Sequence, residues 1–180
     1  MDTKLAWWYI EEKEFNRTGR NMGYDIDRIE YRDWENEIKE LMWSTFLEFE
    51  APLFGKSGTE EFRATIASKA VMEGQTYYGY VKDGVLIGML ATRKEGSHIS
   101  FLFVRKGSQK LGIGRALIGR ALQDCSGDAV TVNAATPAVG FYEKLGFRAQ
   151  EREQEIGGIR FVPMKRAKSD IITDGEDRQI

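Results

Sequence analysis

Gly112 and Gly114 stand directly before a predicted helix, in the segment RKGSQKLGIGRALIGR (residues 105–120), and basic residues precede them. Glycine lets the backbone turn so that neighbouring N–H groups point at one place. The helix that follows adds free N–H groups and the positive end of its dipole. Together these features predict a site for an anion, above all a phosphate or pyrophosphate. A glycine-containing turn with solvated lysines is the alternative interpretation.

Two other phosphate-binding motifs fit the sequence poorly. The segment EAPLFGKS (residues 50–57) ends like a P-loop, but it has Glu50 where the first glycine belongs and follows a predicted helix instead of a strand. The dinucleotide-binding fingerprint requires G-x-G-x-x-G, whereas residues 109–114 read Q-x-x-G-x-G. The glycines therefore do not indicate an NTP or dinucleotide site of these types.

Composition argues against several classes of protein. The chain has 180 residues, 42% of them hydrophobic and 30% charged, as expected of one globular domain, and its net charge of −2 argues against general nucleic-acid binding. Cys125 and His98 are the only residues of their kinds, so no internal disulfide can form and no metal cluster is expected. No apolar run approaches the ~20 residues that span a bilayer, and LAWWYI is too short for a signal peptide. We therefore expect a cytoplasmic protein without a membrane partner.

The first half of the chain predicts one strand and two helices that must support the glycine segment. Residues 25–31 alternate apolar and charged side chains, as a half-buried strand does. Asp33 is a good N-cap for a helix that Pro52 would end. Ser57 and Glu60 have capping-box spacing and predict a second helix that runs to about Met72.

The second half predicts a sheet around the glycine segment. Three strands are expected within residues 76–104, with turns at Asp83-Gly84 and at residues 95–97, and the apolar end of the third strand indicates a central position. A helix over 113–124, a strand over 128–134, a short helix from Thr136 to Gly146 and a strand over 159–165 follow. The pattern predicts one α+β (mixed α/β) domain over residues 25–166 with a mostly antiparallel sheet. Residues 1–24 form an aromatic-rich extension, and residues 167–180 a polar tail.

The reversed glycine spacing resembles a known family. Gln109–Gly114 is similar to the Q/R-x-x-G-x-G/A motif of the GNAT superfamily of N-acetyltransferases. As in that family, the motif follows a buried strand (HISFLFV), opens a helix, and is followed by a strand (AVTVNA) and by FYEKLGF at residues 141–147. The resemblance covers roughly residues 25–165. It implies a GNAT-like fold, in which a twisted sheet is splayed in the middle and flanked by about four helices.

The resemblance also implies acetyl-CoA as a co-substrate and suggests which residues bind it. The strand before the motif would lie beside the pantetheine, with the backbone of Leu102 and Val104 pairing with its amides and the Leu102 N–H facing the thioester oxygen. Asn133 would hold the pantetheine, or would instead serve a turn. Lys110 and Arg115 would add charge, or remain solvated. The expected cofactor-binding residues are Leu102, Phe103, Val104, Gln109, Lys110, Leu111, Gly112, Ile113, Gly114, Arg115 and Asn133.

Two side chains are candidates for proton transfer by the same resemblance. Tyr142, in GFYEKLGF, matches a tyrosine that can protonate the departing CoA thiolate; the alternative is an aromatic contact between the helix and the core. His98 stands where many members of the family have a basic glutamate, and its intrinsic pKa of ~6.5 suits a base. An exposed histidine beside a turn is the alternative, and Glu48, Glu50 and backbone carbonyls with water compete for the base role.

These residues lead to one hypothesis and two rivals. The chain would be an N-acetyltransferase that moves an acetyl group directly from acetyl-CoA to a primary amine, carried by a small molecule or a peptide, in a ternary complex. A non-catalytic acyl-CoA-binding or sensor module would keep the phosphate loop but need neither acid nor base. A protein-interaction domain could instead use the aromatic residues Trp7, Trp8 and Tyr9, which could also form a homodimer contact.

Overall fold

The computed structural model describes residues 25–168. The aromatic extension and most of the polar tail lie outside the described residues, and so do the contacts considered for Trp7, Trp8 and Tyr9. Within the described part, the last strand runs to Ala167, one residue beyond the domain end expected from the sequence.

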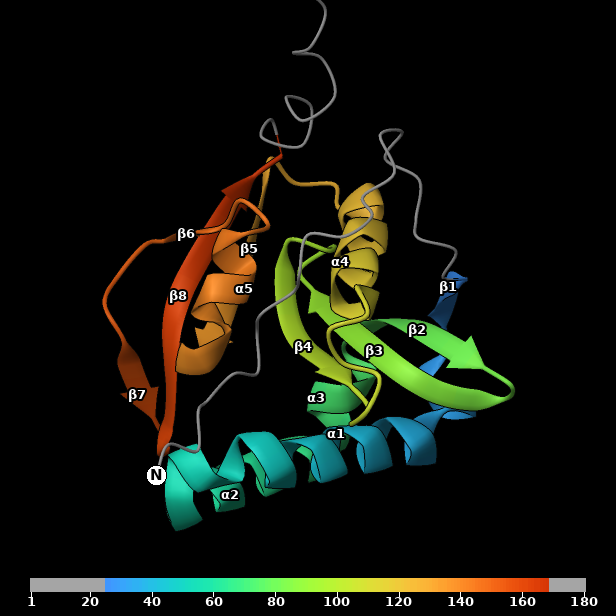
Figure 1. The fold of residues 1–180 in the computed structure, drawn as a ribbon, viewed down its shortest axis with the longest axis horizontal. Coiled ribbons are helices and arrows are strands. Elements are labelled where there is room, and N and C mark those ends of the chain that lie inside the picture. Colours follow the sequence, from blue (N-terminus) through green and yellow to red (C-terminus); the bar gives the residue numbers. More distant parts are fainter. Residues whose placement is uncertain (1–24, 169–180) are drawn as a thin grey trace, which may run out of the picture.

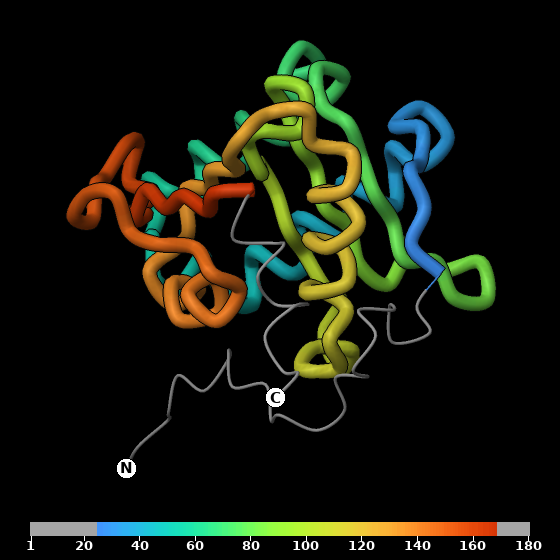
Figure 2. The backbone as a smooth tube through the Cα atoms, turned by 90° about the horizontal axis from the view of Figure 1, so that it is seen from above, coloured from blue at the N-terminus to red at the C-terminus, as the bar shows by residue number. Residues whose placement is uncertain are grey.

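The strands form a single twisted sheet (Figure 1). They pair in the order β1-β2-β3-β4-β5-β8-β6, and β7 pairs with β8. All neighbours are antiparallel except β4 and β5, which are parallel. Figure 2 follows the sheet from β1 (blue) at one edge to β8 (red) near the other. The strands are β1 Ile26–Ile29, β2 Thr76–Lys82, β3 Val85–Arg93, β4 His98–Val104, β5 Ala129–Ala135, β6 Arg148–Ala149, β7 Gln154–Ile156 and β8 Ile159–Ala167.

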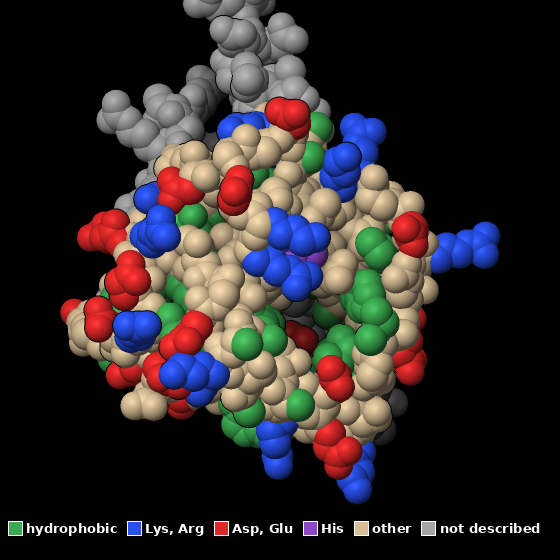
Figure 3. All heavy atoms as spheres, turned by 180° about the vertical axis from the view of Figure 1, so that it is seen from behind, with side chains coloured by type: hydrophobic (Ala, Val, Ile, Leu, Met, Phe, Trp, Pro, Cys, Tyr) green, Lys and Arg blue, Asp and Glu red, His purple; other side chains and the backbone are tan. Residues whose placement is uncertain are grey.

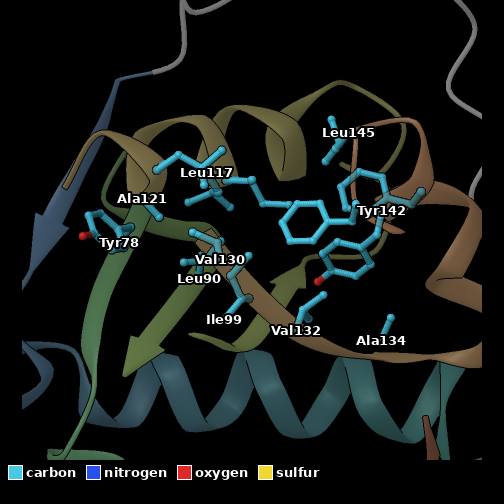
Figure 4. Packing of buried hydrophobic residues seen from close by; sticks show 14 of the residues in the cluster. Tyr78, Leu90, Ile99, Leu117, Ala121, Val130, Val132, Ala134, Tyr142 and Leu145 are labelled. Atoms are coloured by element: carbon cyan, nitrogen blue, oxygen red, sulfur yellow. The ribbon is translucent and has the colours of Figure 1, made fainter. Parts of the chain in front are cut away.

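Helices cover both faces of the sheet. One face packs against α1 (Glu35–Phe49), α2 (Ala51–Ala67) and α3 (Lys69–Glu73), and the other against α4 (Ile113–Asp124) and α5 (Val139–Glu143). Short 3-10 turns at Tyr31–Asp33 and Thr136–Ala138 precede α1 and α5. Two hydrophobic clusters result, one on each face. Figure 4 shows the cluster beneath α4, which includes Tyr142 from α5.

The sheet is splayed between β4 and β5, as the family resemblance implied. These strands pair only where His98 faces Thr131 and Ile99 faces Val132. Beyond Ile99 they diverge, and a β-bulge at Ala91/Thr92 interrupts the pairing of β3 with β4 at the same level. Because β4 has no partner strand on that side, part of its backbone faces a gap instead of a sheet ladder.

The helices on the α1 side depart from the sequence expectations at their ends. Asp33 lies in the 3-10 turn, and α1 begins at Glu35 after Trp34. α1 ends at Phe49, before Pro52 as predicted, and Pro52 itself stands in the first turn of α2, where its missing N–H costs nothing. α2 is kinked at Gly55, which has φ of 64°, and Ser57 follows this kink. Ser57 does not cap the helix, because its hydroxyl donates to the carbonyl of Gly157, 3.3 Å away.

The later elements match the expectations more closely, with two additions. The helix over 113–124 and the strands around it were predicted, and Gly146 ends α5 with φ of 79°. Thr136 does not cap this helix, because its hydroxyl bonds to the Glu153 carboxylate. The strands β6 and β7 were not predicted, because two or three residues are too few for an alternating pattern.

Candidate active site

A pocket of about 570 Å³ opens where β4 and β5 diverge. Its walls come from α1, α2, β4, the glycine loop, the start of α4, β5, α5 and the β7–β8 hairpin, and they include members of both hydrophobic clusters. The pocket therefore passes through the plane of the sheet. Its volume lies within the ~300–1,000 Å³ of small-molecule sites. Figure 3 shows a hollowed face with basic and hydrophobic side chains around the hollow and an acidic side chain deep within it.

The edge of β4 presents backbone groups to this gap. The Arg105 N–H donates to the Ile87 carbonyl across the β3–β4 ladder, at 2.8 Å. Since backbone groups alternate along a strand, Phe103 also faces β3, whereas Leu102 and Val104 aim their N–H and C=O groups at the gap. The side chain of Gln109 donates to the Val104 carbonyl at 3.2 Å. Gln109 thus fastens the glycine loop to the end of β4.

The glycine loop has the backbone conformation that brings N–H groups together. Lys110 and Gly112 have φ of 62° and 84°, and Gly112 is the N-cap of α4. A Cβ on Gly114 would lie 3.3 Å from the ring of Phe141, so glycine also permits close packing of α4 on α5. Lys110, Gly112, Ile113 and Gly114 line the pocket, whereas Leu111 and Arg115 are not among its lining residues.

Two of the basic residues that precede the glycines form ion pairs with α1 and do not line the pocket. The Arg105 guanidinium lies 3.1 Å from the Glu40 carboxylate, and the Lys106 ammonium pairs with Glu48. These ion pairs join the segment after β4 to the outer side of α1. Lys110 is the basic residue of the loop that lines the pocket.

Tyr142 reaches the pocket from the α5 side. It is 5% exposed, and its ring meets Phe141 and Phe147 edge to face, with centroids 5.2 and 5.4 Å apart. Figure 4 shows its hydroxyl directed toward the side of Val132 on β5. Burial, and to a lesser extent the charge of Glu50, raises the pKa of Tyr142 above its ordinary value. The phenol therefore keeps its proton at neutral pH.

Glu50 reaches the same pocket from the α1 side, at the junction of α1 and α2. Its backbone N–H closes the last turn of α1 on the Phe46 carbonyl, at 2.9 Å. Burial raises the pKa of its carboxyl to about 7, so it can exchange a proton near neutral pH. In the sequence Glu50 was one of several candidates for the base, and its only distinguishing signal was its place at the break before Pro52.

His98 does not line the pocket. It lies at the start of β4, where β5 still pairs with β4 and closes the gap, and its side chain is buried. Its Nδ1 lies 2.8 Å from the Thr131 hydroxyl, which in turn donates to the Ser97 carbonyl. Burial, followed by the charges of Arg93 and Lys94, lowers the pKa of His98 to about 4. The fold keeps the His98 ring in the joined part of the sheet, outside the pocket lining, and its role as a base, direct or through water, stays a prediction.

The remaining candidates are distributed around the pocket. Asn133 lines it from β5 and is exposed. Cys125 is buried outside it, with its thiol toward the Gly127 carbonyl. Residues 25–168 contain no group of three His, Cys, Asp or Glu side chains that could hold a metal ion. In the same range, no helix has the length and apolarity needed to cross a membrane.

Comparisons with solved structures show where else this fold occurs. A "GCN5-Related N-acetyltransferase: Aminotransferase, Class-II" from Rhodopseudomonas palustris has a TM-score of 0.66 at 19% identity, over 80% of this chain and 95% of that one. The PaiA N-acetyltransferase of Thermoplasma acidophilum, solved in complex with coenzyme A, has a TM-score of 0.64 at 16% identity, over 81% and 99%. These likenesses establish the fold.

Comparisons of sequence show the family. Human cysteine-rich protein 2-binding protein is 40% identical over 57 residues, which are 31% of this chain and 7% of that protein, so the chain matches a small part of that relative. The family described as "Acetyltransferase (GNAT) domain" matches residues 50–168, from Glu50 to the last described residue, Lys168. The chain therefore belongs to the GNAT acetyltransferase family.

Proposed function

We propose that this protein transfers the acetyl group of acetyl-CoA directly to a primary amine, with donor and acceptor bound together. The observation that carries the proposal is that Glu50 and Tyr142 enter one pocket from opposite faces of the sheet, beside the unpaired edge of β4. The fold shared with PaiA, whose structure contains coenzyme A, supports the choice of donor.

The described residues fit such a donor. The αL turn at Lys110 and Gly112 and the first N–H groups of α4 would hold its phosphates. The gap-facing backbone of Leu102 and Val104 would pair with the pantetheine arm, as a missing strand would, and Asn133 faces the same gap from β5. Binding both reactants in this pocket would account for much of the rate by orienting them.

The proposed proton transfers use the two titratable side chains that enter the pocket, Glu50 and Tyr142. Acetyl-CoA supplies the acetyl thioester. Glu50 accepts a proton from the ammonium of the acceptor, whose free amine then forms the C–N bond, and the Leu102 N–H stabilises charge on the carbonyl oxygen. The C–S bond breaks, Tyr142 protonates the departing thiolate, and the second proton that the nitrogen loses as it becomes an amide restores the Tyr142 phenol. Because protonated Glu50 no longer raises the pKa of Tyr142, the first transfer makes Tyr142 a better donor.

Titration calorimetry with acetyl-CoA, dephospho-CoA and ATP tests the donor, and a thiol-release assay with amines tests the reaction. Glu50→Gln and Tyr142→Phe should each lower kcat about 100-fold or more while leaving the Kd for acetyl-CoA unchanged. The matched control is Tyr78→Phe, which removes a hydroxyl bonded to Asp124 at 3.0 Å outside the pocket and should leave kcat unchanged.

The outcomes separate the proposal from its rival. Lack of acetyl-CoA binding would exclude the acetyltransferase function. Tight binding with no amine acetylated would favour the non-catalytic acyl-CoA-binding module. Turnover untouched by both substitutions would leave the acetyl transfer standing and overturn the proton-transfer roles of Glu50 and Tyr142.

A further inference from the structure

The half of the pocket that faces α1 and α2 is built of aromatic rings. Two of the lining residues, Phe49 and Phe101, are only partly buried, so their rings are in position to meet a ligand. The phenylalanines that line this side come from α1, α2, β4 and β8: Phe46, Phe49, Phe54, Phe62, Phe101, Phe103 and Phe161. An apolar wall of this extent favours an apolar ligand.

The rings are fixed against one another. Phe46 and Phe62 are stacked with centroids 4.0 Å apart, and Phe62 meets Phe103 at 5.8 Å with a tilt of 52°. On the outer side Trp43 stacks on Phe62 at 6.5 Å, and the Arg63 guanidinium covers the Trp43 ring. A wall held in this way offers preformed flat surfaces to another ring.

Charges lining the pocket are few and nearly balanced. Glu50 and Glu61 are the acids, and Arg93, Lys110 and Arg160 are the bases. Several ammonium groups on one acceptor would need several carboxylates to replace their water. This lining fits one ammonium group, near Glu50, better than a polycation.

The β7–β8 hairpin closes the end of this half. A Cβ on Gly158 would lie 2.7 Å from the backbone N of Gly58 in α2, so the hairpin tip packs directly on that helix. The Arg160 guanidinium donates to the Leu53 carbonyl at 2.8 Å and fastens the hairpin from its other side. The hairpin therefore limits how far an acceptor can extend past this end of the pocket.

We infer that the acceptor is a small primary amine attached to an aromatic or otherwise apolar body, with its ammonium group at Glu50 and its body against the phenylalanine wall. This rests on the proposed acetyltransferase function and names the acceptor for it. Polyamines, aminoglycosides and lysines of folded proteins are poor acceptors on this view.

The test compares 2-phenylethylamine with spermidine and a lysine-containing peptide in the thiol-release assay. We expect kcat/KM to be highest for 2-phenylethylamine. Phe49→Ala should lower it about 10-fold or more, mostly through KM, and leave the Kd for acetyl-CoA unchanged. Leu47→Ala is the matched control: Leu47 is 44% exposed on the same helix, lies outside the pocket, and should leave both constants unchanged.

The results distinguish a failure of the acceptor inference from a failure of the proposed acetyltransferase function. A preference for spermidine or the peptide, or no effect of Phe49→Ala, would overturn the acceptor inference and leave the acetyltransferase function standing. Failure to bind acetyl-CoA, or binding without acetylation of any amine, would overturn both.

Discussion

Glu50 and His98 are titratable side chains whose pKa values burial shifts in opposite directions. The pKa of the Glu50 carboxyl is raised to about 7, and the pKa of the His98 imidazole is lowered to about 4. In both cases burial favours the neutral form. Glu50 faces the pocket and His98 faces Thr131, so the first shift bears on the proposed catalysis, and both shifts bear on how stability depends on pH.

Glu50 should lower the stability of the ligand-free protein as pH rises. Its folded pKa is above its unfolded value, so between about pH 4.5 and 7 the folded state binds more protons than the unfolded state, and stability falls across that window. Glu50→Gln should be more stable at pH 8 by up to about 3 kcal/mol, with little difference at pH 4. Urea unfolding at both pH values measures this. Glu48→Gln, which removes an exposed partner of Lys106, should change stability by less than about 1 kcal/mol at either pH.

His98 should make the protein sensitive to acid. Its folded pKa lies below its unfolded value, so stability is present above about pH 6.5 and is lost as the pH falls toward 4. His98→Gln should flatten this part of the pH–stability profile and keep most of the activity at pH 8. If His98→Gln instead abolished turnover without changing stability, the base role first considered for His98 would stand and that of Glu50 would fall.

At the scale of the element, the junction of β4 with α4 is where the proposed donor site would lie. Gly112→Ala places a Cβ at a φ of 84°, which costs about 1–2 kcal/mol. The strained loop should then bind acetyl-CoA about 10-fold or more weakly. Its N–H groups would be displaced, and a loss of ~1.4 kcal/mol of binding free energy already raises the Kd tenfold. Calorimetry measures the loss.

Gly119→Ala is the matched control within α4. A Cβ there would meet no atom within 4 Å, so the substitution should stabilise the helix by about 0.5–1 kcal/mol without weakening acetyl-CoA binding. Equal losses of affinity in the two variants would show that α4 as a whole, and not its N-terminal turn, governs binding.

At the scale of the whole molecule, the sheet is joined at its middle by a short parallel contact between β4 and β5. A donor bound in the gap would bridge the two parts. At 100 times its Kd, acetyl-CoA should raise the free energy of unfolding by about 2.7 kcal/mol.

Hydrogen exchange should show where this bridge forms. The Leu102 amide faces the gap and should gain protection on binding beyond the global increase, whereas the Phe103 amide already faces β3 and should show only the global increase. Equal changes at the two amides would argue against pairing of the donor with β4.

The sequence alone determined the order of the main elements and the position of the glycine loop before α4. Their signals are local: alternation over 76–104, helical spacing over 113–124, and glycines beside a helix start all act between near neighbours in the chain. Tyr142 was also predicted from a short motif, and the structure places it in the pocket. Short strands and helix caps were missed or misplaced where a tertiary partner, such as Gly157 for Ser57, outweighed the local preference.

Only the tertiary structure decided which groups meet. Arg105 and Lys106 looked like part of the phosphate site, yet acids of α1 pair with them. His98 had the right intrinsic pKa for a base, but the joined part of the sheet buries it beside Thr131. Glu50 became the stronger candidate because the splay of β4 from β5 opens a pocket between it and Tyr142. Burial and proximity across the sheet depend on how distant segments pack, and no pattern of neighbouring residues encodes that packing.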